Sequence, residues 1–337
     1  MRHAGGEMDS LMAMFVHEVR VMIRAGQHLN LVNVLGFTLD GKWTLLTKHS
    51  YSFRVVKFHR SKSNNIPENP TLLVELCDMG SLLANLQQCQ RDPTKFVNLL
   101  DSGEDCSTRT DGSEKIHYDQ APSGGKVLGD DERDKSCSLS TSDLVSFAYQ
   151  VSRGMEHLSA KNIVHRDIAS RNILLTKKKV AKISDFGMAR WSETAYMMTS
   201  ATAVNLPIRW MSPETIASMI FDQKSDVWSY GVLLWEMFSL GQIPYPNVAV
   251  AGRVEQFGQW LLAGNRLDRP QFCPDNVFAE MGKCWNRNAA DRPSFADLSV
   301  NFEGIISTDV AGYYMHLNEP YAQFTKELFK PETYVYL

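Results

Sequence analysis

The spacing of apolar residues predicts the regular structure at the N-terminal end of the chain. Between Asp9 and Ala25 the apolar side chains recur at intervals that lie on one face of a helix, at Leu11, Phe15, Val19 and Met22. Two short apolar runs follow, LVNVLGF and TLLVEL. β-Branched residues and nearby turn residues favour a buried strand for the second run. The first part of the chain is therefore expected to combine a helix with strands.

The pattern changes near residue 90 and again near residue 139. Residues 90–138 are rich in Asp, Ser, Gly and Lys and contain few apolar side chains, so they cannot bury enough surface to offset the entropy of ordering. We predict a disordered insert there. Helical patterns resume at 139–159 and dominate after Pro213. A strongly apolar stretch, 227–241, is interrupted by Glu236 and is too short to span a bilayer, which predicts a buried helix. The predicted fold class is α+β with a mainly helical second part.

Composition narrows the class of protein. Of the 337 residues, 44% are hydrophobic and 22% are charged, which is typical of a soluble protein with a core. A formal net charge of -3 argues against nucleic acid or an anionic membrane as the main partner. The six cysteines form no CxxC pair, which indicates reduced thiols. The N-terminus has no apolar run that resembles a signal peptide. As written, the chain is expected to be soluble and intracellular.

Two neighbouring polar loops carry the candidate chemistry. The first lies in IVHRDIASRNILL, which begins at Ile163, and the second lies in KISDFGMAR. Phosphoryl transfer needs oxygen ligands for Mg²⁺ and a base beside the attacking hydroxyl. Asp167 is the candidate base, and Asn172 and Asp185 are the candidate metal ligands. Either short motif alone can arise by chance, but together and in this order they match the protein-kinase signature.

These motifs resemble the protein-kinase family, and its tyrosine-specific branch in particular. That branch carries an HRDLAARN-type catalytic loop, and this chain has HRDIASRN with Arg171 at the matching position. Serine/threonine kinases usually place a lysine where this chain has Ala169. The segment LPIRWMSPE resembles the tyrosine-kinase substrate platform, in which Pro207 forms a wall for a tyrosine ring. A serine/threonine kinase with altered motifs is the less favoured alternative.

The resemblance implies a bilobal fold that uses ATP and Mg²⁺, and it assigns further roles. Val74 is expected at the back of the adenine pocket, with backbone groups of Glu75 and Cys77 at the adenine edge. Asp226 is expected to brace the catalytic loop, and Arg292 to pair with Glu214 in the core, where a charge needs a partner. The positions given structural roles are His165, Arg166, Phe186, Gly187, Glu214, Asp226 and Arg292.

The polar insert is similar to that of the split-kinase receptors, the relatives of the platelet-derived and vascular endothelial growth factor receptors, with the fibroblast growth factor receptors next. The resemblance then implies a full-length receptor that dimerises, with this region on the cytoplasmic side of the plasma membrane. Tyr196 is the candidate phosphorylation site, which Arg166 can pair with once it carries a phosphate; the alternative is an ordinary loop tyrosine. Five tail tyrosines are either docking sites for phosphotyrosine-binding adaptors or part of a solvated tail: Tyr313, Tyr314, Tyr321, Tyr334 and Tyr336.

The N-terminal part departs from the family pattern. Glu18 matches the helix glutamate that pairs with a strand lysine and so helps to hold the nucleotide, yet no glycine-rich loop or lysine strand precedes it. Val55-Val56-Lys57 resembles the lysine motif but follows Glu18, and we interpret it as coincidence. Residues 42–68 form an atypical insertion or reflect an error in the gene model. The expected layout is a partial N-terminal lobe with hinge (1–89), the insert (90–138), a complete C-terminal lobe (139–306) and a tail (307–337).

The leading hypothesis is therefore an N-terminally truncated tyrosine kinase domain that transfers the ATP γ-phosphate to tyrosine hydroxyls of protein substrates. The alternative is a catalytically weak, pseudokinase-like fragment or scaffold. The missing lysine region favours the alternative. The intact set of Asp167, Asn172 and Asp185 favours the enzyme.

Overall fold

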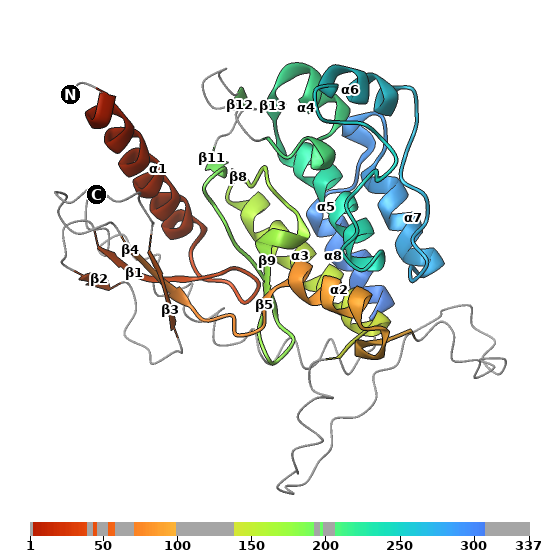
Figure 1. Ribbon diagram of the computed structural model, residues 1–337, viewed down its shortest axis with the longest axis horizontal. Helices are drawn as coiled ribbons and strands as arrows, with labels where there is room; N and C mark the ends of the chain where they lie inside the picture. Colours follow the sequence, from red (N-terminus) through yellow and green to blue (C-terminus); the bar gives the residue numbers. More distant parts are fainter. Residues whose placement is uncertain are drawn as a thin grey trace, which may run out of the picture.

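The computed structural model describes residues 3–38, 43–45, 53–57, 71–98, 138–191, 196–197 and 206–306. One long helix and a four-stranded sheet form one part, and a bundle of helices forms the other (Figure 1). The α+β class is therefore confirmed. The tail (307–337) and most of the insert (99–137) lie outside the described residues, so the predictions about their disorder and their tyrosines stay predictions.

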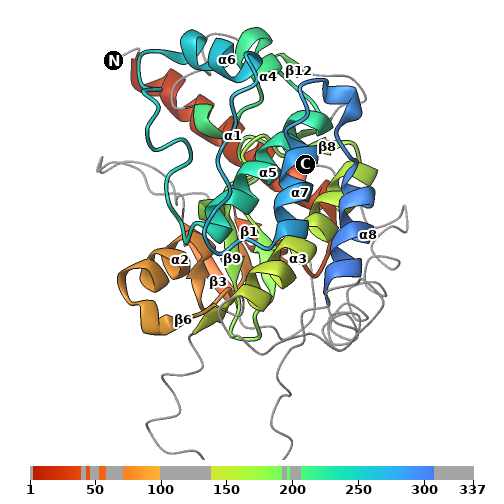
Figure 2. The ribbon, with the colours of Figure 1, turned by 90° about the vertical axis from the view of Figure 1, so that its right-hand side faces the viewer.

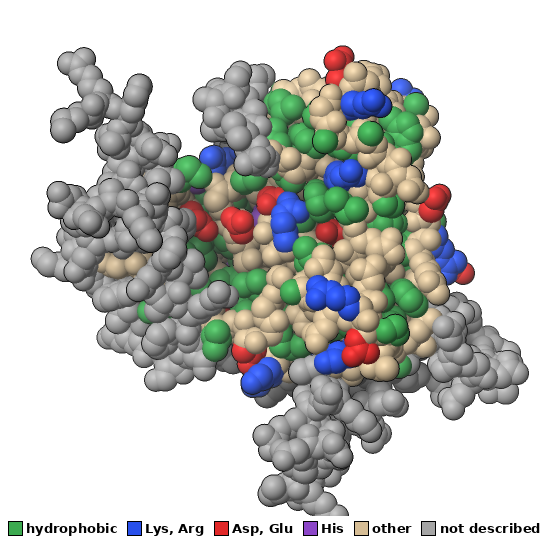
Figure 3. Space-filling model, viewed as in Figure 1, with side chains coloured by type: hydrophobic (Ala, Val, Ile, Leu, Met, Phe, Trp, Pro, Cys, Tyr) green, Lys and Arg blue, Asp and Glu red, His purple; other side chains and the backbone are tan. Residues whose placement is uncertain are grey.

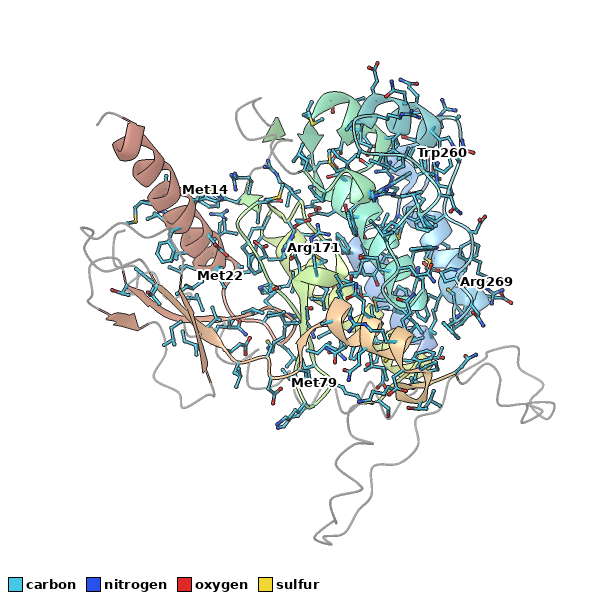
Figure 4. The ribbon with its side chains drawn as sticks, in the orientation of Figure 1. Met14, Met22, Met79, Arg171, Trp260 and Arg269 are labelled. Carbon is cyan, nitrogen blue, oxygen red and sulfur yellow. The ribbon has the colours of Figure 1, made fainter. Side chains whose placement is uncertain are left out.

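The helix α1 (His3–Ala25) is the predicted N-terminal helix, and it begins earlier than Asp9. Phe15, Val19 and Met22 are buried, as their spacing predicts. Figure 4 shows Met22 between α1 and the sheet. Gly26 ends the helix with a φ of 67°, a conformation that costs glycine little, and its N–H donates to the Met22 carbonyl at 3.1 Å.

The sheet beside α1 is antiparallel, with the order β2-β1-β4-β3. Its strands are β1 (Val34–Thr38), β2 (Trp43–Leu45), β3 (Phe53–Lys57) and β4 (Thr71–Glu75). We found no period in residues 42–68, yet β2 and β3 both come from this segment. Strand β3 contains the Val-Val-Lys sequence and pairs with β4 on the side opposite β1. Pairing with the buried strand β4 thus stabilises β3 as a strand, although the local sequence pattern does not indicate one.

The entrance to the polar insert is ordered further than predicted. Helix α2 (Leu82–Arg91) begins at Ser81, whose Oγ accepts the Ala84 N–H at 3.2 Å, and it passes the predicted boundary at residue 90. A 3₁₀ turn (Pro93–Lys95) and strand β6 (Phe96–Val97) follow, and β6 pairs in parallel with β7 (Leu139–Ser140). The Phe96 ring packs on Phe272 with centroids 5.0 Å apart. The prediction of disorder from residue 90 is therefore wrong for 90–98, because a capped helix end and one aromatic contact order this polar sequence.

Helix α5 (Gln223–Phe238) runs through the middle of the helical part in both views (Figures 1 and 2). Every residue from Ser225 to Phe238 is buried, which confirms the predicted buried helix. Around it lie α3 (Thr141–Ala160), α4 (Pro213–Ser218), α6 (Val254–Leu262), α7 (Asp275–Cys284) and α8 (Phe295–Ile305). Within the described ranges, no helix is both long and apolar enough to cross a membrane.

Short strands carry the two polar loops to the junction between the parts. The catalytic-loop motif lies between β8 (Ile163–Val164) and β9 (Ile173–Leu175), and β10 (Ala181–Ile183) leads into the second motif. Strands β10, β9 and β5 (Gly80–Ser81) form one sheet, so the loops and the segment after β4 are tied together. The remaining strands pair in twos: β11 (Arg190–Trp191) with β8, and β12 (Tyr196–Met197) with β13 (Ile220–Phe221).

Candidate active site

The catalytic loop is held by a carboxylate from the central helix. The backbone N–H groups of His165 and Arg166 donate to Oδ2 and Oδ1 of Asp226, at 2.7 and 2.8 Å. Arg166 has a φ of 72°, which an L residue adopts only when its surroundings enforce it. Burial raises the pKa of Asp226 to about 7, and the two N–H donors act in the opposite direction. The contact that the resemblance implies for Asp226 is present.

The three predicted catalytic-loop residues meet at one carboxylate. Asn172 donates through Nδ2 to the backbone oxygen of Asp167 at 2.8 Å and to its Oδ2 at 2.7 Å. The Arg171 guanidinium forms an ion pair with Oδ1 of the same residue. Both oxygens of the Asp167 carboxylate are therefore oriented by neighbours in its own loop, as a general base requires.

The second loop lies against the first. The Ser184 N–H and hydroxyl both donate to the Asn172 carbonyl at 2.8 Å. The buried Phe186 ring packs edge-on against His165, with centroids 5.3 Å apart. Burial lowers the pKa of His165, and the charges of Asp167 and Asp185 both act to raise it. The charges of both carboxylates thus act on one imidazole. In Figure 3, acidic and basic side chains gather where the sheet part meets the helical part.

The oxygen atoms of this site fit a magnesium ion. The Asn172 amide nitrogen donates to Asp167, so its oxygen, Oδ1, is the atom left to face a cation. The Asp185 side chain is exposed, and its carboxylate accepts the Gly187 N–H at 3.3 Å. Carboxylate and amide oxygens are the ligands that Mg²⁺ prefers. Asn172 and Asp185 are thus the residues suited to hold it.

The segment expected at the adenine edge is fixed by a buried ion pair. The Glu75 carboxylate accepts the Asn33 backbone N–H at 2.8 Å and its Nδ2 at 2.7 Å, and it lies 2.9 Å from Lys182 Nζ. The Glu75 N–H donates to the Asn33 carbonyl at 3.1 Å, so that nitrogen does not face a nucleotide. Val74 is buried and Cys77 follows at the strand end. The contacts of these residues with adenine stay predictions.

Sequence reasoning missed Asn33 and Lys182. Lys182 reads as an ordinary strand lysine, and Asn33 as a polar residue in an apolar run. A buried lysine needs an anion, but nothing local reveals that Lys182 is buried or that its partner lies across the sheet in Glu75.

Glu18, on α1, lies beside the second loop. Its carboxylate accepts the Phe186 backbone N–H, and burial together with the nearby Asp185 charge raises its pKa to about 7. Among the described residues, no lysine or arginine forms an ion pair with it. Its neighbour His17 anchors α1, since Nε2 lies 2.8 Å from the Ala189 carbonyl and the ring stacks on Trp191 at 5.5 Å. The helix is thus fixed next to Asp185.

We expect Glu18→Gln to stabilise the metal-free protein above pH 7. A folded-state pKa raised from 4.5 to about 7 means that the folded chain retains a proton that the unfolded chain releases. Stability therefore falls as pH rises from about 4.5 to about 7. Glutamine keeps an acceptor for the Phe186 N–H without the charge. Urea unfolding in EDTA should show a gain of roughly 3 kcal/mol at pH 8 and little change at pH 4. An equal effect at both values of pH would contradict the assignment.

An ion pair joins the end of the platform segment to the far side of the helical part, and it lies at the edge of the core, because the Arg292 side chain is fully buried while that of Glu214 is 41% exposed. Arg292 donates to Glu214 through both terminal nitrogens, at 2.6 and 2.9 Å. Its guanidinium also lies over the Trp228 ring, 5.0 Å from the centroid. The pair that the resemblance implies is therefore present in bidentate geometry.

Tyr196 belongs to the short strand β12, where its backbone lies opposite Phe221. Its side chain lies outside the described residues. The guanidinium of the buried Arg166 packs on the Phe221 ring at 5.0 Å. Phe221 thus pairs with the backbone of Tyr196 and contacts the side chain of Arg166. Phosphorylation of Tyr196 stays a prediction.

Comparisons with known proteins identify relatives of the whole described region. The family model for protein tyrosine and serine/threonine kinases matches residues 4–302. The chain is 34% identical over 320 residues to the mast/stem cell growth factor receptor Kit of Takifugu rubripes, covering 93% of this chain and 31% of that protein. It is 35% identical over 317 residues to human platelet-derived growth factor receptor alpha (86% and 29%) and 34% identical over 304 residues to the macrophage colony-stimulating factor 1 receptor of Danio rerio (87% and 29%). The chain spans less than a third of the length of these curated relatives.

Proposed function

The chain belongs to the protein tyrosine and serine/threonine kinase family, and on that premise we propose that it is the catalytic domain of a receptor-type tyrosine kinase. The proposed reaction transfers the γ-phosphate of ATP to tyrosine hydroxyls of protein substrates. The observation that carries the proposal is the Asp167 carboxylate, which Arg171 and Asn172 orient from within one loop.

In the proposed mechanism, Asp167 orients the substrate phenol and accepts its proton as the oxygen attacks the γ-phosphorus. Asn172 and Asp185 would hold Mg²⁺, which when bound would neutralise charge on the phosphate oxygens. Arg171 keeps Asp167 in position and carries positive charge close to the reacting oxygens. Asp226 holds the loop in its strained conformation through two backbone N–H groups. Positioning and electrostatics, rather than covalent chemistry by the protein, supply the rate.

Specificity for tyrosine is supported by the residues around the base. A small residue, Ala169, stands where a serine/threonine kinase usually carries lysine. The segment LPIRWMSPE, which contains Pro207, resembles the tyrosine-kinase substrate platform, and its Trp210 ring lies under the Arg171 guanidinium, 4.3 Å away. The similarity to receptors for growth factors supports a full-length protein with this region on the cytoplasmic side of the plasma membrane. Dimerisation and binding of adaptors to tail phosphotyrosines belong to the same proposal.

A phosphotransfer assay tests the proposal. The chain is incubated with Mg-ATP and matched peptides that differ only in tyrosine or serine, and transfer to tyrosine alone is expected. Thermal shifts with ATP, with and without Mg²⁺, measure nucleotide binding separately. Nucleotide binding without transfer would instead support the second candidate, a catalytically weak scaffold. The Glu18 carboxyl, which forms no ion pair among the described residues, is the observation that favours this second candidate.

A further inference from the structure

Helix α5 carries a carboxylate, Glu236, in the core of the helical part. Only 2% of this residue is exposed. A carboxylate in such surroundings is costly unless several donors surround it. Glu236 accepts the Ser170 N–H at 3.0 Å, the Ser170 hydroxyl at 2.7 Å and the Trp210 indole N–H at 2.8 Å. Burial raises the pKa of Glu236, and these donors act in the opposite direction.

The donors come from the two segments that must cooperate in the reaction. Ser170 begins the 3₁₀ turn (Ser170–Asn172) that carries Arg171 and Asn172. Trp210 ends the 3₁₀ turn (Ile208–Trp210) of the substrate platform. One carboxylate therefore contacts both the loop that carries the candidate base and the surface expected to receive the substrate ring.

The Trp210 ring contacts Arg171, which in turn pairs with the candidate base Asp167. The Arg171 guanidinium lies over the ring, 4.3 Å from its centroid, and pairs with Asp167. Figure 4 shows Arg171 at the border between the sheet and the helical part. The single indole N–H fixes the ring plane when it donates to Glu236, and a cation over an aromatic face follows that plane. The Trp210 carbonyl is held separately, by the Ser229 hydroxyl at 2.7 Å.

We propose that Glu236 is a positioning residue that aligns the substrate platform with the catalytic base through Trp210 and Arg171. The proposal rests on the proposed function and adds the device that holds a tyrosine substrate in register with Asp167. A misplacement of about 1 Å in such a site can cost on the order of 100-fold in rate. Loss of the indole hydrogen bond is therefore expected to act on peptide use and not on nucleotide binding.

The chain offers variants that remove these bonds one at a time. Trp210→Phe keeps an aromatic face for Arg171 but loses the N–H. Ser170→Ala loses only the hydroxyl, and alanine is the residue that the tyrosine branch carries at this position. Glu236→Gln can keep all three contacts, because its oxygen accepts both N–H groups and its nitrogen donates to the Ser170 hydroxyl. Trp260→Phe, on α6, is the matched control for loss of an indole.

The test measures kcat and KM for a tyrosine peptide and KM for ATP in each variant. Trp210→Phe should lower kcat/KM for the peptide by about 10- to 100-fold, while KM for ATP stays within about twofold of the wild type. Glu236→Gln should remain close to the wild type, Ser170→Ala should fall between the two, and Trp260→Phe should show no change. A purely structural role for Glu236 predicts instead that Trp210→Phe lowers the melting temperature and leaves both kinetic constants of the remaining folded enzyme unchanged.

A second readout separates the failure of this inference from the failure of the proposed function. If the wild-type chain transfers no phosphate, the proposed function fails, and the inference is then decided by the Kd of a fluorescent tyrosine peptide in the presence of Mg-ADP. Trp210→Phe should weaken that binding at least about fivefold relative to Trp260→Phe, a smaller loss than the roughly 100-fold effect on rate. Equal affinities, or no peptide binding by the wild-type chain, overturn the inference.

Discussion

Replacing Asp167 by asparagine is expected to lower kcat for phosphate transfer to a tyrosine peptide by about 10²- to 10⁴-fold. Asparagine keeps the size of the side chain but cannot accept the phenol proton at the moment of attack. The hydrogen bond from Asn172 can still reach its carbonyl oxygen, so the loop is expected to keep its shape. The measurement is steady-state transfer under saturating Mg-ATP.

The effect should be confined to the chemical step. The thermal shift produced by Mg-ATP should be the same for Asp167→Asn and the wild type, because the proposed nucleotide contacts come from Asp185 and the segment after β4. Asp268→Asn removes an exposed carboxylate elsewhere on the helical part and should leave the rate unchanged. A rate for Asp167→Asn within threefold of the wild type would show that another group takes the proton.

Replacing Arg292 by leucine is expected to lower the free energy of unfolding by about 2–3 kcal/mol. The Arg292 side chain is fully buried, and besides Glu214 it donates to the carbonyls of Asn286 and Lys224, both at 3.0 Å. Its loss leaves these carbonyls without their donor. The Glu214 side chain is 41% exposed, so water replaces part of its contact. Urea unfolding followed by tryptophan fluorescence measures the change.

Two further variants separate the loss of the pair from the loss of one partner. Glu214→Leu combined with Arg292→Leu should cost less than the sum of the two single changes, because no charge is then left unpaired. Lys177→Leu removes an exposed ion pair whose atoms are 4.0 Å apart and should cost less than about 1 kcal/mol. Equal losses for Arg292→Leu and Lys177→Leu would contradict the role assigned to the buried Arg292 side chain.

The sequence predicted the parts of the site that are local and missed those that depend on distant contacts. Asp167, Arg171 and Asn172 lie within one loop, and their match to the motif of a known family placed them together. The partners Glu75 and Lys182 are far apart in sequence, and the sheet and β10 bring them together. Glu236 was visible only as an interruption of an apolar stretch, and its meaning required the positions of Ser170 and Trp210.

The fold shows the same division. Helices α1, α3 and α5 follow from apolar spacing, and β4 follows from its β-branched run. Strands β2 and β3 were missed because a short edge strand is stabilised by its neighbour more than by its own pattern. The ordered structure of residues 90–98 was missed because composition describes only the average of a window. The side chain of Asp92 caps the 3₁₀ turn, and the Phe96 ring packs on Phe272, so two residues stabilise the local structure.

The parallel pair of β6 and β7 has a consequence for how this gene can change over evolutionary time. Phe96 and Leu139 lie opposite each other in this strand pair. The segment between them therefore begins and ends at the same fixed point. For a chain segment whose two ends are fixed, each doubling of its length adds only about 0.6 kcal/mol to the entropic cost of closure. Residues can therefore be gained, lost or exchanged in this segment, and new recognition sequences can be acquired there. The helices of the helical part keep their packing.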